Sequence, residues 1–208
     1  MSLFVWRLIS PVCGLDPALG LIFEFLMERR KIMSNNQPGF WGLALKTILV
    51  HTVTYSFMGI LAYHFLNYSE VFARPEMACW MRQTSDPLVM AGPLFQPIRG
   101  LIFALAFFPL REVIFGRKNG WLVLWWVLVA LGILSTFGAA PGSVEGMVYT
   151  IIPLSIETYL EVVLQALLLS FILFYWVNHP EKKWLYWVMG IAFILMIIFA
   201  ILGLVIRQ

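Results

Sequence analysis

The chain consists of long apolar runs separated by short polar segments. Four runs reach roughly 20 residues, the length that a helix needs to cross the hydrocarbon core of a bilayer. They are residues 41–66, 89–115, 121–139 and 184–206. Their apolar positions are continuous, whereas the strands of a membrane β-barrel alternate apolar and polar residues over about ten positions. The pattern therefore predicts membrane-spanning helices.

A fifth apolar run, residues 147–177, is too long to be one span. At 1.5 Å per residue it would extend about 46 Å, which exceeds the hydrocarbon thickness. Pro153 suits the first turn of a helix, so we expect a span over 153–177 and an interfacial or re-entrant segment before it. The expected fold is all-α, a polytopic bundle of about five transmembrane helices that forms one domain over residues 41–208.

The segment 1–40 is predicted to lie in the membrane interface. Asp16 and Pro17 have the residue types of a helix start, and a helix from there to Lys31 contains only about ten apolar residues. A sixth span is the alternative. Met33, followed by Ser-Asn-Asn-Gln-Pro, resembles an ordinary protein start, so residues 1–32 could also be a mis-called extension.

Composition supports a bilayer as the solvent. The 208 residues are 61% hydrophobic and 12% charged, whereas a soluble domain carries about 25% charged residues. The net charge of +3 does not indicate nucleic-acid binding, because the basic residues flank apolar runs and form no patch. We expect a multi-pass integral protein of the plasma membrane or an inner membrane.

The loops differ in charge between the two sides of a five-span model. One side carries basic residues, namely Arg29, Arg30, Lys31, Arg117, Lys118, Lys182 and Lys183. The other side carries mainly acids, Glu70, Glu76, Asp86 and Glu145, against Arg74 and Arg82. Because positive loops stay in the cytoplasm, we expect the basic loops inside and the C-terminus outside.

Away from their inner ends, the predicted spans contain three charged residues, Arg99, Glu157 and Glu161. Such residues are costly in hydrocarbon and usually face a partner or a water-filled cavity. Counting along the helices from the inner interface places both Arg99 and Glu161 in the outer half of the bilayer. The sequence therefore predicts an Arg99–Glu161 ion pair.

Other polar residues are predicted to surround this pair. Gln165 shares a helical face with Glu157 and Glu161, since the three are four residues apart, and Gln96 precedes Arg99 by one turn. His51 and Tyr55 share a face of the first span and could line a polar path, although such residues more often bond to neighbouring helices.

The loop Ala-Pro-Gly-Ser-Val-Glu-Gly is predicted to lie above this polar core. It contains Glu145, and Gly142 and Gly146 would let its backbone approach a ligand. Lys46, near the inner end of the first span, is expected to extend its ammonium toward the inner headgroups.

No motif for catalysis, metal binding or cofactor binding is present. The chain lacks His-Glu-x-x-His, the Gly-x-Ser-x-Gly elbow and a phosphate-binding glycine loop. Cys13 and Cys79 stand alone, which excludes a cysteine metal motif. We assign no catalytic residue, metal or cofactor.

These observations lead to three hypotheses. The first is a non-enzymatic membrane protein that binds or passes a small solute, ion or lipid headgroup at the polar core. The second is a structural or accessory subunit, in an oligomer or with a partner, whose buried charges specify packing. The third is an intramembrane enzyme that uses Glu157 or Glu161 as acid or base.

Overall fold

The computed structural model describes residues 38–79, 81–136, 140, 142–150 and 156–206. Within these residues the chain forms helices joined by turns, and no strand is present. The predicted N-terminal interfacial helix and Pro153 lie outside the described residues. The fold is thus all-helical where it is described, as the sequence predicts.

Three helices are long and apolar enough to cross a membrane. They are α3 (Phe40–Phe65), the Tyr159–Asn178 part of α11 (Ile156–Asn178), and α12 (Trp184–Ile206). A separate short helix, α10 (Val144–Tyr149), precedes α11, so the run 147–177 is not one continuous helix. These three helices indicate a membrane protein.

The other two predicted spans are shorter than expected. The run 89–115 is divided into α6 (Pro87–Met90), α7 (Gly92–Phe107) and α8 (Arg111–Phe115). Pro109 explains the break after α7, because a proline has no N–H to donate to the carbonyl four residues earlier and its ring clashes with that carbonyl. The run 121–139 forms α9 (Gly120–Val129) and a π-helical turn, η1 (Ala130–Leu134). A bundle of five full-length spans is therefore not confirmed.

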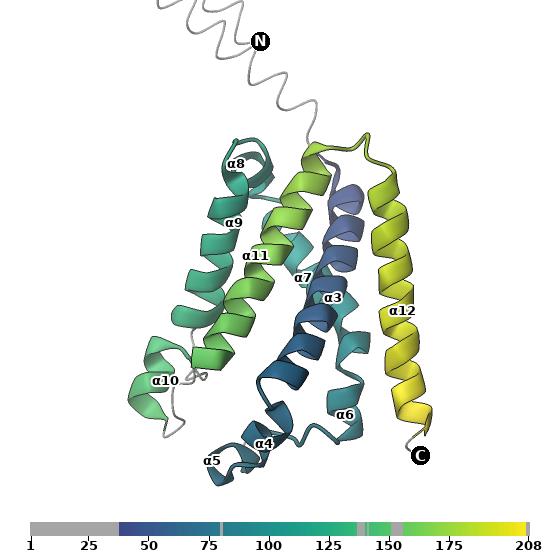
Figure 1. The fold of residues 1–208 in the computed structure, drawn as a ribbon. Coiled ribbons are helices and arrows are strands. Elements are labelled where there is room, and N and C mark those ends of the chain that lie inside the picture. The colour runs from purple at the N-terminus through teal and green to yellow at the C-terminus, as the bar shows by residue number, and fades with distance from the viewer. Residues whose placement is uncertain (1–37, 80, 137–139, 141, 151–155, 207–208) are drawn as a thin grey trace, which may run out of the picture. The chain divides into compact units, whose positions relative to one another are not determined.

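Within residues 38–206, α3 packs against α7, α11 and α12, and α9 packs against α11 (Figure 1). One end of this bundle contains α8 and the α11–α12 connection. We call it the basic end, after Arg111, Arg117, Lys118, Lys182 and Lys183. The other end contains α4 (Tyr68–Ala73), α5 (Pro75–Ala78), α6 and α10. We call it the acidic end, after Glu70, Asp86 and Glu145.

A glycine sets the close approach of α3 and α7. A Cβ atom placed on Gly100 would lie 2.8 Å from the Cα atom of Ile48. Real Cβ atoms are not found that close to backbone, so a larger residue would push the two helices apart. Small residues at helix crossings are typical of membrane bundles, in which packing rather than hydrophobic burial holds helices together.

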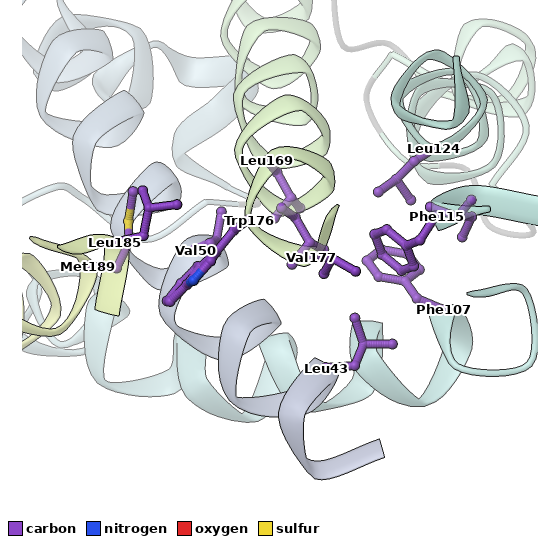
Figure 2. Packing of buried hydrophobic residues seen from close by; sticks show 12 residues of the cluster. Leu43, Val50, Phe107, Phe115, Leu124, Leu169, Trp176, Val177, Leu185 and Met189 are labelled. Carbon is purple, nitrogen blue, oxygen red and sulfur yellow. The ribbon is translucent and has the colours of Figure 1, made fainter. Parts of the chain in front are cut away.

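The apolar core lies toward the basic end. Its fully buried members include Leu43 of α3, Leu124 of α9, and Leu173 and Trp176 of α11, and Figure 2 shows the cluster between the helices. Leu185 and Met189 add the first turns of α12. Farther toward the acidic end the buried side chains are both polar and apolar, and they include His51, Thr54, Ser56, Gln96, Met58 and Ala62.

Candidate functional site

A hydrogen bond between α3 and α7 forms the middle of the polar region. His51 Nε2 lies 3.1 Å from Gln96 Oε1, and Gln96 Nε2 donates to the carbonyl of Gly92 at 3.1 Å. Since Oε1 can only accept, His51 donates through Nε2, and its Nδ1 atom is buried without a partner. The expectation that His51 bonds to a neighbouring helix is confirmed.

Tyr55 lies one turn from His51 toward the acidic end. Its hydroxyl is 3.7 Å from the position that a Cβ atom on Gly92 would take, an ordinary van der Waals distance, so Tyr55 lies beside the first turn of α7. The phenol interacts electrostatically with Arg99, with Glu161 and with Tyr68. Tyr55 therefore lies within electrostatic range of both charged residues that the sequence predicts to be paired.

Glu161 is hydrogen-bonded to a residue outside the long helices. The hydroxyl of Tyr68 in α4 donates to the Glu161 carboxylate. Burial, followed by this hydrogen bond, raises the pKa of Tyr68 well above its usual range, so the hydroxyl keeps its proton. Asn67, with a left-handed backbone (φ 49°), makes the turn after α3 that brings Tyr68 over α11.

Arg99 is exposed on the side of α7. Its guanidinium lies 5.6 Å from the ring centroid of Phe103, and no carboxylate of the described residues lies within 4.0 Å of it. Among these residues the ion pair that forms is Arg82–Asp86, at 3.0 Å near the start of α6. The predicted Arg99–Glu161 pair is therefore wrong.

The axial positions of the two residues explain this difference. Lys46 Nζ donates to the carbonyl of Trp176 at 3.0 Å, which aligns α3 with α11. Glu161 precedes Trp176 by fifteen residues in α11, so it lies about 22 Å from this bond toward the acidic end.

Arg99 lies much closer to the same reference bond. Its helix is aligned with α3 by Gly100 against Ile48 and by Gln96 against His51. These contacts place the Arg99 backbone about 5 Å from the Lys46 level, and hence about 17 Å from Glu161. Counting residues from Arg111 overestimated the distance of Arg99 from the basic end. The reason is that the chain turns between α7 and α8 instead of continuing as one helix.

Lys46 also departs from its prediction. The side chain is 5% exposed, and its ammonium lies 5.7 Å and 5.8 Å from the ring centroids of Trp176 and Tyr186. The Trp176 carbonyl belongs to the last turn of α11, where carbonyls lack helical partners. Lys46 therefore stays inside the bundle and caps the C-terminus of α11.

Three candidate residues remain, Gln165, Glu145 and Glu157, and none has a described hydrogen bond to Tyr55 or Glu161. Gln165 is partly buried one turn from Glu161, and Glu145 is exposed in the first turn of α10. Glu157 belongs to α11, but its side chain lies outside the described positions. Among the described residues no group of acids, histidines and cysteines could hold a metal ion.

The loop that contains Gly142 and Gly146 forms hydrogen bonds with Tyr159 and Ser143. Tyr159 Oη donates to the carbonyl of Gly142 at 2.6 Å, and the Gly146 N–H donates to Ser143 Oγ at 2.9 Å. Gly142 has φ +88°, a conformation that favours glycine. These bonds give both glycines a role in forming the turn.

Sequence reasoning missed Tyr68 as a site residue. Tyr68 lies two residues after the predicted first span, where an aromatic residue is typical of the membrane interface. The tight turn at Asn67, which directs Tyr68 inward, has no recognisable sequence pattern. No protein-family model, no curated protein and no solved structure matches the chain, so the geometry of these residues carries the argument for function.

Proposed function

We propose that the protein binds a small solute or lipid headgroup through an ammonium group at Glu161, Tyr55 and Tyr68. The observation that carries this proposal is the partly buried Glu161 carboxylate, for which the described residues supply a phenol hydroxyl but no cation. A carboxylate in that setting is stabilised by an external cation.

The surrounding side chains favour an organic cation over a metal ion. One carboxylate and two phenols are too few hard ligands for Ca²⁺, which takes six to eight oxygens. Aromatic rings attract ammonium groups through their negatively polarised faces. Tyr68, which stacks on Phe72 with ring centroids 5.3 Å apart, would supply such a surface next to the carboxylate.

The proposal includes a topology of five spans, in the plasma or inner membrane, with the basic end in the cytoplasm. The two shorter apolar helices, Gly92–Phe107 and Gly120–Leu134, would be the additional spans. The common position of α8 and the α11–α12 connection at one end supports this arrangement (Figure 1). Glu161 would then face the outer side.

Thermal unfolding of the purified protein tests the ligand site, with tryptophan fluorescence as the signal. Ethanolamine, titrated at constant ionic strength against sodium chloride, should raise the midpoint of unfolding, since a ligand of the native state stabilises it. Glu161→Gln should weaken this effect at least tenfold, because a hydrogen bond to a charged group contributes about 1.5–3 kcal/mol. Glu145→Gln, the matched change at an exposed acid of the same end, should leave it unchanged.

Two further measurements complete the test. Tyr68→Phe keeps the ring but loses the hydroxyl, so it should retain part of the ethanolamine effect. This variant provides a second test of the site if Glu161→Gln does not fold. In nanodiscs, a stabilisation by phosphatidylethanolamine relative to phosphatidylglycerol identifies the headgroup as the source, whereas an effect of free ethanolamine alone identifies a solute. An unchanged midpoint with all these ligands, or an equal shift in Glu161→Gln, contradicts the proposal.

An accessory subunit without a ligand is the second candidate function. The observation that favours it is the exposed Arg99, whose charge the described bundle does not neutralise. Loss of this role would follow substitution of Arg99 and not of Glu161, which separates the two candidates.

A further inference from the structure

The outward surface of α7 combines large apolar side chains with one positive charge. Phe95, Ile98, Ile102 and Leu105 are 52–62% exposed, and their spacing of three and four residues puts them on one side of the helix. Arg99 is exposed among them. We call these five residues the Arg99 face.

Arg99 lies too deep in the bilayer for lipid headgroups to neutralise its charge. Its backbone is level with the stretch from Ile48 to His51, about 12–16 Å along α3 from Phe40 and more than 20 Å from Phe65. For a helix that crosses a hydrocarbon core of about 30 Å, this is close to the midplane. Lipid phosphates lie outside that core, beyond the reach of an arginine side chain at this depth.

The partners that the described residues offer do not compensate the charge. The guanidinium makes a cation–π contact with Phe103, which is worth about 0.5–2 kcal/mol. A charged side chain at the bilayer centre costs at least about 2.5–3.5 kcal/mol on insertion scales. A carboxylate at the same depth would remove most of that cost.

A second copy of the chain does not supply this carboxylate from its described residues. Glu161 lies about 17 Å from the Arg99 level. Glu112 follows α7 at the basic end, and Glu181 lies in the α11–α12 connection. In a parallel copy each of these acids would be at the wrong depth.

We infer that the Arg99 face binds a transmembrane helix of a different protein, which carries an aspartate or glutamate near the bilayer midplane. The exposed apolar side chains above and below Arg99 would pack against that helix, and the ion pair would fix its depth. Interfaces between membrane helices combine packing with polar contacts in this way. The inference depends on α7 crossing the membrane and is independent of a ligand at Glu161.

A designed peptide can take the place of the natural partner in the test. A leucine-based transmembrane helix with one central glutamate is reconstituted with the labelled full-length protein, and association is measured by energy transfer. We expect association with this peptide, and at least tenfold weaker association with the same peptide carrying leucine in place of the glutamate. A peptide with its glutamate moved to one end should bind equally weakly.

Variants of the protein assign the effect to the Arg99 face. Arg99→Met should lose the preference for the central glutamate. Arg111→Met, the matched change at the basic end, should retain it, and so should Glu161→Gln, which separates this result from the ligand site. Equal binding of all peptides, equal binding by Arg99→Met, or Arg99-dependent self-association of the protein in place of peptide binding would overturn the inference.

Discussion

Lys46 illustrates how a single residue can be charged, buried and still stabilising. Its ammonium donates to the Trp176 carbonyl and faces two aromatic rings. A cation at the C-terminus of a helix also interacts favourably with the helix dipole. Removing this side chain leaves a buried carbonyl without its donor, which carries the full desolvation cost of that group.

Lys46→Met should therefore lower the free energy of unfolding by about 1–3 kcal/mol. The measurement is unfolding by sodium dodecyl sulfate in mixed micelles, with tryptophan fluorescence as the signal. Lys183→Met removes an exposed charge at the same end and should stay within about 0.5 kcal/mol of the natural protein. A Lys46→Met value as small as that of the control would show that the contact with Trp176 is not stabilising.

At this scale the sequence identified candidate residues but not the groups that contact them. The rule that charges in spans are rare and functional selected Arg99 and Glu161, and helical spacing correctly grouped His51 with Tyr55. The partners depend on the relative register of helices that are far apart in the chain. Tyr68 and Trp176 could therefore not be predicted as the groups that contact Glu161 and Lys46.

At the scale of helices, the length of an apolar run and the positions of its prolines decide whether it forms one continuous helix. The apolar runs predicted α3 and α12 to within one residue at each end, because both runs lack a proline and end at polar or charged residues. The run 89–115 contains Pro93, Pro97 and Pro109. Pro97 is tolerated within α7, whereas the chain leaves the helix before Pro109. Hydrophobicity alone could not distinguish these two prolines.

Chemical labelling tests whether α7 and α9 are spans. Both native cysteines are first replaced by serine, and a single cysteine is introduced at Lys118, which is exposed between α8 and α9. With five spans, Lys118→Cys in intact cells should react with an impermeant maleimide only after permeabilisation. With three spans, formed by α3, α11 and α12, it would react from outside.

Two positions serve as controls for this labelling, because both topologies place them alike. Ser69→Cys, in α4, should react from outside, and Lys183→Cys, between α11 and α12, only after permeabilisation. Outside labelling of Lys118→Cys together with the expected result for both controls would contradict the five-span arrangement, and with it the membrane depth of Arg99.

For the whole molecule, the two ends of the bundle differ in the side chains that they contain. Apolar packing is concentrated at the basic end, where α3, α7, α9, α11 and the first turns of α12 meet (Figure 2). The opposite end holds the Tyr68–Glu161 contact and the short helices α4, α6 and α10. With the proposed ligand site at Glu161, the packed end would supply stability and the opposite end would bind the ligand.

The central claim is that Arg99 and Glu161 serve separate sites at separate depths. A double-mutant cycle of Arg99→Met and Glu161→Gln tests it most directly, with the free energy of unfolding in mixed micelles as the readout. Because the Tyr55 phenol interacts with both residues, the cycle is made in a Tyr55→Phe background. Residues more than about 7–10 Å apart that share no partner have additive effects within about 0.3–0.5 kcal/mol. We expect the double variant to equal the sum of the single variants within that range, whereas a coupling energy of about 1 kcal/mol or more would show that the two charges interact directly and would contradict the claim.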